Sequence, residues 1–223
     1  MKNKYLNNAH ISEAKFRKVL KYFASDFDAT KCSQLTNLSR KTINKLYHKF
    51  RVRIYQIEEE NQSNKINGEI EIDEAYFGAK RIRGKRGREA KGKVPVIGLL
   101  KRNGKVYTQI VENCKRHKLM PIIKGKILEK STIYTDGWKS YDGLVLNGYK
   151  HYRIHHHENE FARGKNHVNG IESFWSYTKR RLLKFNGIRK DKFLLHLKES
   201  QFRWNNRQNI YKLLLKNFRE KPL

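Results

Sequence analysis

Apolar positions in roughly the first 55 residues follow a helical spacing. The spacing is roughly helical at Ile11, Ala14, Phe16, Val19, Leu20 and Phe23. We expect a short helix over 30–35, a tight turn at 36–38 and a second helix with Ser39 as its N-cap. The second helix would carry an apolar stripe of Ile43, Leu46, Tyr47 and Phe50. Its outward face would carry Arg40, Lys41, Asn44 and Lys45.

That arrangement predicts a helix-turn-helix whose second helix enters the major groove of DNA. The alternative is a small three-helix bundle with a solvated basic face. Residues 56–67 are polar and contain an acidic cluster, so we interpret them as the end of the second helix and a linker.

From about residue 68 the pattern predicts strands. Residues 69–77 begin with polar and apolar alternation, 94–100 are continuously apolar, and 105–111 alternate after a turn at Asn103–Gly104. These three strands would form an antiparallel meander. Further strands are expected at 131–136 and 149–155, and helices at 119–128, 138–146, 168–183, 190–205 and 210–218. The order β-β-β-α-β-α-β-α-α predicts a mixed α/β domain over 68–207, with a C-terminal helix in 208–223.

The composition excludes several classes of protein and favours others. The 223 residues are 38% hydrophobic, which is enough for a packed core, and no apolar run has the length of a membrane span. Only two cysteines occur, and the first residues lack the apolar core of a signal peptide, so we expect a cytoplasmic protein. The formal net charge of +29 favours a polyanionic partner, above all nucleic acid.

Three carboxylates stand out in this basic chain. Asp73 lies in a strand flanked by apolar residues, where burying a charge is costly. Asp136 ends the fourth strand, and Glu172 lies on an amphipathic helix. Three carboxylates can hold two Mg²⁺ or Mn²⁺ ions about 3.5–4 Å apart for in-line displacement at phosphorus. Taken singly, Asp136 is more often part of a plain turn, and Glu172 is more often a solvated helix residue.

Three sequence blocks together resemble a known family. Residues 71–78 (EIDEAYFG), 134–141 (YTDGWKSY) and 167–180 (HVNGIESFWSYTKR) are similar to the catalytic blocks of DDE transposases of bacterial insertion sequences. The ISXO2-like branch is the most similar, and the resemblance runs from about 68 to 207. It implies an RNase H-like fold in which Asp73, Asp136 and Glu172 are the catalytic residues and metal ligands.

The resemblance also implies an activity and partners. Such an enzyme binds the double-stranded DNA ends of its element, frees a 3′-hydroxyl and joins it to target DNA with two metal ions. Joining two ends implies a homodimer or a larger synaptic complex, in the bacterial cytoplasm and associated with the nucleoid. Many relatives carry an N-terminal zinc ribbon built on cysteine pairs. Cys32 and Cys114 alone cannot supply it, so the helix-turn-helix is the candidate for recognising the ends.

Two rival functions remain open at this stage. One is a nuclease of the same fold without strand transfer. The other is a helix-turn-helix regulator or RNA-binding protein whose acids are structural.

Further residues are candidates for DNA contact. A basic loop between the first two strands of the sheet carries Lys80, Arg81, Arg83, Lys85, Arg86 and Arg88. His167 and Asn169 precede Glu172, and Lys179 and Arg180 follow it, with Arg181 expected to extend the basic surface. Trp175 would either stack on a base or pack in the core. A histidine cluster at 155–157 is better explained by phosphate contact or a structural role than by zinc.

Overall fold

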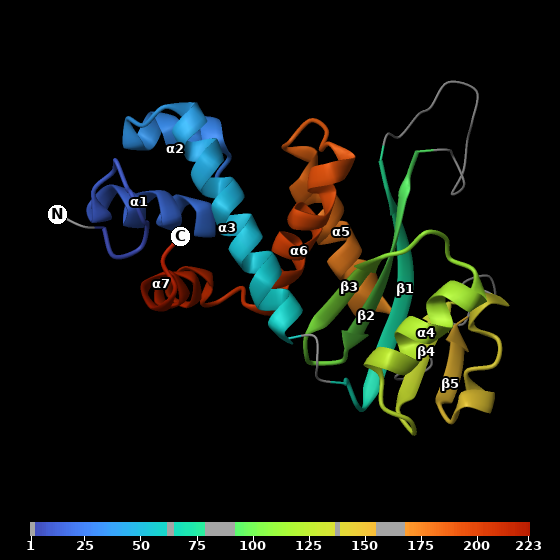
Figure 1. The fold of residues 1–223 in the computed structure, drawn as a ribbon. Helices are drawn as coiled ribbons and strands as arrows, with labels where there is room; N and C mark the ends of the chain where they lie inside the picture. Colours follow the sequence, from blue (N-terminus) through green and yellow to red (C-terminus); the bar gives the residue numbers. More distant parts are fainter. Residues whose placement is uncertain (1–2, 62–64, 79–91, 137–138, 155–167) are drawn as a thin grey trace. The chain divides into compact units, whose positions relative to one another are not determined.

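The computed structural model describes residues 3–61, 65–78, 92–136, 139–154 and 168–223 (Figure 1). Contacts divide the chain into two compact units. One unit combines Met1–Glu58 with Asn206–Leu223, and the other is Glu59–Asn205. The second unit is therefore inserted between the two segments of the first.

The first unit is helical. Its helices are α1 (Glu13–Ala24), α2 (Ala29–Thr36), most of α3 (Arg40–Glu60) and α7 (Ile210–Glu220). Side-chain oxygens cap the first three helices: Ser12 accepts from the Lys15 N–H, Asp28 from the Lys31 N–H and Ser39 from the Thr42 N–H. Local sequence chemistry therefore sets where these helices begin.

Helices α2 and α3 have the predicted turn between them. Asn37 adopts the left-handed conformation (φ 53°) at the C-cap of α2, which asparagine tolerates better than most residues. The predicted stripe on α3, Ile43, Leu46, Tyr47 and Phe50, is buried. The two helices and the turn are thus as the sequence predicted.

The C-terminal helix completes the core of the helical unit. The Phe218 ring stacks on Phe50 at 5.1 Å between centroids and meets Phe16 edge-on at 5.9 Å. The backbones of the two chain ends also pair, because the Asn7 N–H donates to the Leu223 carbonyl and the Leu223 N–H to the Tyr5 carbonyl. The sequence predicted a helix here but not its partner.

The second unit is built on a five-stranded mixed sheet. Its strands are β1 (Glu69–Phe77), β2 (Val94–Lys101), β3 (Val106–Ile110), β4 (Thr132–Asp136) and β5 (Lys150–Ile154). The spatial order is β3-β2-β1-β4-β5. Strands β1, β2 and β3 pair antiparallel, as predicted, whereas β4 pairs parallel with β1 and with β5.

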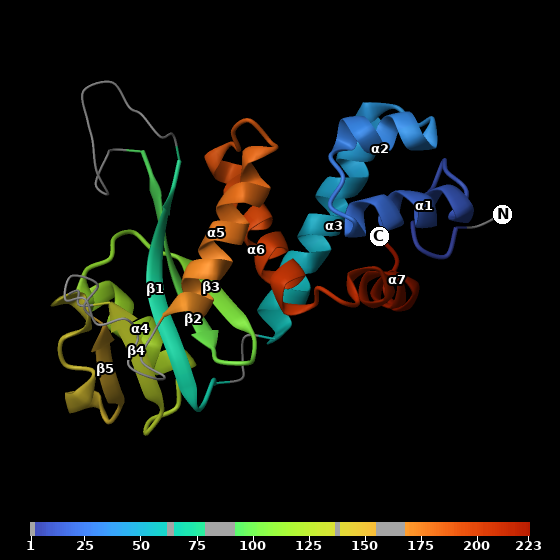
Figure 2. The same cartoon turned by 180° about the vertical axis from the view of Figure 1, so that it is seen from behind.

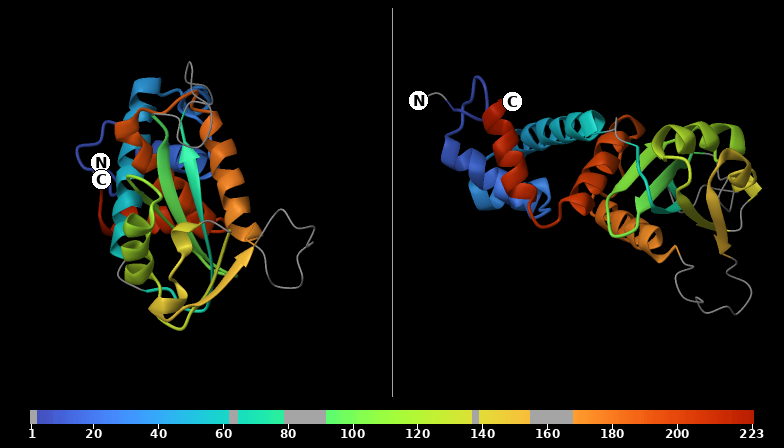
Figure 3. Two further views of the ribbon diagram at one scale, coloured as in Figure 1. Left: turned by 90° about the vertical axis from the view of Figure 1, so that its right-hand side faces the viewer. Right: turned by 90° about the horizontal axis from the view of Figure 1, so that it is seen from below.

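Helices cover both faces of the sheet. Helix α4 (Arg116–Lys126) lies on one face, and α5 (Asn169–Leu183) with α6 (Lys190–Asn205) lies on the other (Figures 1 and 3). Along β1, Ile70 and Ile72 join the core beneath α4, whereas Ala75 and Phe77 join the core beneath α5. Alternation along this central strand therefore assigns each side chain to one helix layer.

Side chains of α6 occupy the free edge of β3. Gln201 accepts from the Thr108 N–H at 2.8 Å, and Asn205 both accepts from and donates to the backbone of Val106. The Lys198 ammonium donates to the Thr108 carbonyl at 2.9 Å. Helix α6 thereby blocks the pairing of another strand at this edge.

The segment predicted as a helix over 138–146 differs from expectation. Its described residues form two short 3₁₀ turns, η2 (Lys139–Tyr141) and η3 (Val145–Asn147). Gly143 lies between them with φ of +94°, a conformation incompatible with a continuous α-helix. The sequence-based helix was therefore wrong here.

Helix α5 packs closely against β2 through a glycine. A Cβ on Gly98 would lie 2.5 Å from Cζ2 of Trp175 and 2.9 Å from Cδ1 of Ile171. The absence of a side chain thus lets the indole rest directly on the strand. Trp175 is 3% exposed, and its ring also contacts Phe77 and Phe174.

A buried ion triad joins α5 to α6. The Glu199 carboxylate lies 2.5 Å from Arg181 and 2.9 Å from Arg203, and all three side chains are almost fully buried. Charges removed from water need partners of this kind. The sequence had placed Arg181 on the basic surface, and that prediction was wrong because Glu199 neutralises it inside the fold.

We predict that Phe218→Ala will destabilise the helical unit by about 3–5 kcal/mol, because it leaves a cavity beside the rings of Phe16 and Phe50. Residues 1–58 and 206–223 contain no tryptophan, so tryptophan fluorescence monitors only the sheet unit. Urea denaturation should shift part of the circular dichroism transition to lower urea and leave the fluorescence midpoint in place. Leu213→Ala, on the same helix but 41% exposed, is the matched control and should change little. Equal effects of the two substitutions would refute the docking of α7.

Gly98→Ala should lower the free energy of unfolding by about 1–3 kcal/mol, because the added methyl group displaces the Trp175 indole. The same substitution at Gly125 is the control, since no atom lies within 4 Å of a Cβ there. Gly125→Ala lies in α4 and should stabilise the protein by up to about 1 kcal/mol. Thermal denaturation of both variants checks the opposite signs. A neutral Gly98→Ala would contradict the close packing of α5 on the sheet.

Candidate active site at the ends of two parallel strands

The first two candidate acids lie on neighbouring parallel strands. The β1–β4 register pairs Ile70 with Ile133 and Glu71 with Tyr134. Continued by two residues, it brings Asp73 level with Asp136. Both aspartates are half-buried. The register thus places two acids that are far apart in sequence on neighbouring strands, Asp73 in the middle of β1 and Asp136 at the end of β4.

Alternation shows which face of the sheet these acids occupy. Asp73 is the cross-strand partner of Gly98, above which Ile171 and Trp175 of α5 lie. Tyr134, two residues before Asp136, belongs to the core beneath α5. Both aspartates therefore project on the face covered by the helix that carries Glu172.

A buried tyrosine is hydrogen-bonded to the residue that follows Asp73. The Tyr141 hydroxyl is fully buried and donates a short hydrogen bond to Glu74, the residue after Asp73. Burial raises the pKa of Tyr141 well above its usual value, and the negative charges of Glu74, Asp73 and Asp136 raise it further. One hydroxyl thus experiences the field of three carboxylates at this end of the sheet.

Glu172 lies in the first turn of α5 and is exposed. Among the described residues, no three His, Cys, Asp or Glu side chains lie close enough together to hold a metal ion. Glu172 therefore does not complete such a group with Asp73 and Asp136 in this arrangement. The donor chemistry of the aspartate pair nevertheless fits Mg²⁺ or Mn²⁺, which prefer carboxylate oxygens.

The exposed strip of α5 is polar and basic. Glu172, Ser176 and Lys179 follow one another at steps of four and three residues, and all are exposed. Asn169 and Arg180 are exposed as well. These side chains are accessible, as their assignment as DNA contacts requires.

The assignment of Trp175 as a DNA contact was wrong. Its side chain is core, resting on Gly98 and against Phe77, and no face of the ring is open to a base. The indole Nε1 has no hydrogen-bond partner within the described part of the chain. On α5, Trp175 lies next to both the buried Ile171 and the exposed Glu172, so helical spacing alone does not show whether it is buried. Its packing against the sheet shows that it belongs to the core.

The remaining candidate DNA contacts divide into two sets. On α3, Arg40, Lys41, Asn44 and Lys45 are exposed, as predicted. The loop residues Lys80, Arg81, Arg83, Lys85, Arg86 and Arg88 lie outside the described residues, as do His167 and the histidines at 155–157.

Sequence reasoning missed three residues near the acids. Glu71 lies two residues before Asp73 and on the same face of β1, and Glu74 and Tyr141 form the hydrogen-bonded pair described above. Strand alternation could have indicated Glu71, since positions two apart share a face. The Tyr141–Glu74 contact depends on a turn that no local pattern predicts.

Within the described residues, no helix combines the length and the apolar character that crossing a membrane requires.

Comparison with known proteins places this chain in a family. Residues 65–205 match the ISXO2-like transposase domain. An "uncharacterized transposase-like protein" of Haemophilus influenzae is 47% identical over 102 residues, which cover 46% of this chain and 82% of that protein. An "uncharacterized protein in transposable element ISH50" of Halobacterium salinarum is 29% identical over 154 residues. That match covers 62% of this chain and 52% of the halobacterial protein, about half its length.

Two solved structures show a remote likeness. The crystal structure of the Mos1 strand transfer complex has a TM-score of 0.34 and 9% identity, covering 92% of this chain and 75% of that one. The Mos1 transposase paired-end complex with left transposon end has a TM-score of 0.30 and 9% identity, covering 91% and 78%. Similarity at TM-scores this low does not establish a shared fold or function. The assignment depends instead on the sequence match, which spans more than half of the chain: the protein belongs to the family of ISXO2-like transposase domains.

Proposed function

We propose that this transposase breaks and joins DNA at the sheet end where Asp73 and Asp136 lie level. The observation that carries the proposal is their placement on adjacent parallel strands, on the face covered by α5. The sheet order, a three-stranded antiparallel meander followed by two parallel strands, supports an RNase H-like catalytic domain. Asp73 and Asp136 are the first two catalytic residues, and Glu172 is the third.

The reaction consists of two displacements at phosphorus. In the first, a water oxygen attacks a phosphodiester at the element end, and the departing 3′-oxygen takes up a proton to become a hydroxyl. In the second, that 3′-hydroxyl attacks a target phosphodiester, and a new phosphodiester forms as the target strand breaks. No covalent enzyme intermediate is needed, so no protein nucleophile is assigned.

The three carboxylates would hold Mg²⁺ or Mn²⁺, because hard cations take oxygen ligands. A pair of such ions, when bound, activates the attacking oxygen and stabilises the leaving oxygen. The chain's own residues orient the DNA: Lys179 and Arg180 of α5 contact phosphates beside the scissile bond. Two ends require two active sites, which makes a homodimer the smallest complete assembly.

The helical unit would recognise the element ends. Helices α2 and α3 form the helix-turn-helix, and the exposed basic residues of α3 approach the major groove. The formal net charge of +29 supports binding to the DNA backbone. Location in the bacterial cytoplasm, with the nucleoid, stays a prediction.

Asp136→Asn and Asp73→Asn should each lower strand transfer at least about 100-fold while DNA binding persists, because the amide keeps the shape and removes the charge. The assay uses pre-nicked DNA carrying the ends of the flanking element, with and without Mg²⁺. Asp191→Asn is the control, since Asp191 is exposed and pairs with Arg189 at the start of α6. Metal-dependent nicking without joining would favour a nuclease. DNA binding without cleavage by the wild type would favour a regulator.

Replacing Arg40, Lys41 and Lys45 together by Ala should weaken DNA binding more than tenfold. It should also reduce the slope of log K against log salt by about 2–3, since each phosphate contact contributes about 0.9. The matched control removes Arg17, Lys18 and Lys21, which are the same residue types on the exposed face of α1. Fluorescence anisotropy across a salt series measures both. Equal losses in the two triple variants would show that net charge, rather than α3, governs binding.

A further inference from the structure

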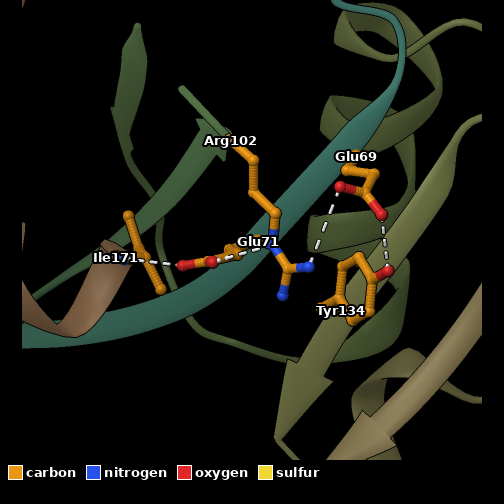
Figure 4. Close-up of polar contacts among 5 residues, drawn as sticks. All are labelled: Glu69, Glu71, Arg102, Tyr134 and Ile171. Atoms are coloured by element: carbon orange, nitrogen blue, oxygen red, sulfur yellow. Dashed lines mark hydrogen bonds and ion pairs between the residues drawn. The ribbon is translucent and has the colours of Figure 1, made fainter. Parts of the chain in front are cut away.

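A second carboxylate of β1 is buried beneath the candidate active site. Glu71 is 1% exposed and lies two residues before Asp73. Its Oε2 accepts from the backbone N–H of Ile171 at 2.9 Å, and its Oε1 accepts from Nε of Arg102 at 3.0 Å (Figure 4). Both carboxylate oxygens therefore have partners on other segments.

The bond to Ile171 replaces a missing cap on α5. The residue at the N-cap position, Val168, makes no side-chain capping bond, and the first N–H groups of a helix have no partner within it. A carboxylate at this end satisfies one of these N–H groups and interacts favourably with the helix dipole. Helix α5 is thus capped by a strand far away in sequence.

Gly170 makes room for this cap. A Cβ at Gly170 would lie 2.8 Å from Oε2 of Glu71 and 2.6 Å from Cδ2 of Leu100. Real Cβ atoms essentially never make contacts shorter than 3.0 Å. A larger residue at position 170 would therefore push the first turn of α5 away from β1.

Arg102 balances the charge of Glu71 and reaches a third element. Its guanidinium lies 3.7 Å from the centroid of the Tyr134 ring on β4, and its side chain is 12% exposed. The Tyr134 hydroxyl donates to Glu69 at 2.9 Å, and Figure 4 shows the guanidinium directed towards that same carboxylate. Arg102 therefore contacts Glu69, Glu71 and Tyr134 and connects them in one network.

Each element that carries a proposed catalytic acid joins this network next to the acid. Glu71 is two residues from Asp73 on β1, and Tyr134 is two residues from Asp136 on β4. Ile171 immediately precedes Glu172 on α5. Figure 2, which views the molecule from the side of α5, shows the start of this helix beside β1.

We propose that Glu71 is a positioning residue that fixes the first turn of α5, and hence Glu172, relative to Asp73 and Asp136. It touches neither DNA nor metal and acts through the Ile171 N–H and through Arg102. The assignment of a catalytic consequence rests on the proposed function, whereas the anchoring of α5 can be measured without it.

The test compares Glu71→Ala, Glu71→Gln and Glu199→Gln. Alanine removes the acceptor and the charge, whereas glutamine keeps an oxygen for the Ile171 N–H and loses the charge that pairs with Arg102. Glu199→Gln breaks the buried ion triad near the other end of α5 and serves as the control for general destabilisation. If Glu71→Ala does not fold, Glu71→Gln carries the test.

Two readouts separate positioning from stability. The first is hydrogen exchange at the Ile171 amide in the metal-free protein, which should be at least tenfold faster in Glu71→Ala and nearer the wild type in Glu71→Gln. The second is the Mg²⁺ concentration that half-saturates DNA cleavage. It should rise about tenfold or more in Glu71→Ala, as for loss of a residue that orients metal ligands, and less in Glu71→Gln. Glu199→Gln should lower the melting temperature and leave the Mg²⁺ requirement unchanged.

Opposite outcomes have distinct meanings. Wild-type exchange at Ile171 and a wild-type Mg²⁺ requirement in both Glu71 variants, with an active wild type, would overturn this inference and leave the proposed function standing. An equal rise in Mg²⁺ requirement in Glu199→Gln would overturn it as well. A wild type without Mg²⁺-dependent cleavage would overturn the proposed function and with it the catalytic role of Glu71.

Discussion

The side-chain alternation of the central strand β1 governs the organisation of the sheet unit. Ile70 and Ile72 face the core beneath α4, whereas Glu71, Asp73 and Ala75 face α5. A strand buried on both faces is ordinarily apolar, because burying a charge is costly. At Glu71, Arg102 and the Ile171 N–H offset that cost. The same face two residues further on carries Asp73, so one strand supplies both a structural carboxylate and a proposed catalytic one.

Parallel pairing explains how distant acids become neighbours. Two parallel strands need a long crossover, and here β2, β3 and α4 intervene between β1 and β4 along the chain. The C-terminal half of β1 and the C-terminal end of β4 then lie on the same side of the sheet along the strand direction. α/β proteins commonly place ligand groups at the carboxyl ends of their strands. The level placement of Asp73 and Asp136 is thus a consequence of topology.

The local sequence pattern was sufficient to predict elements whose structure depends on their own residues. Alternation predicted β1, the apolar run predicted β2, and Asn103 adopts φ of 54° in the turn expected between β2 and β3. The capping residue Ser39 placed the start of α3. The three sequence blocks predicted the family. They also singled out the three acids as catalytic, which stays a prediction.

The sequence pattern failed to predict features that depend on contacts between elements far apart in sequence. An amphipathic stripe shows that α7 must pack, but its partner is the aromatic core of α1 and α3 at the other end of the chain. Arg181 was expected on the surface, because nothing near it in sequence shows that Glu199 neutralises it. Trp175 was ambiguous until Gly98 provided the surface on which it packs. Glu71 needed its contact with Ile171, a hundred residues away, before its role could be inferred.

Helix α5 is consequently held along its whole length by residues outside it. Glu71 of β1 caps its first turn, Gly98 of β2 receives Trp175 in its middle, and Glu199 of α6 pairs with Arg181 in its last turn. The attachment by Glu71 lies in the turn that carries Glu172, so it is Glu71, and not Glu199, that orients this acid. The exposed strip of Glu172, Ser176 and Lys179 then has a fixed direction within the sheet unit. A lysine presented in this way needs little reordering to meet a DNA phosphate, which lowers the entropic cost of assembling the site.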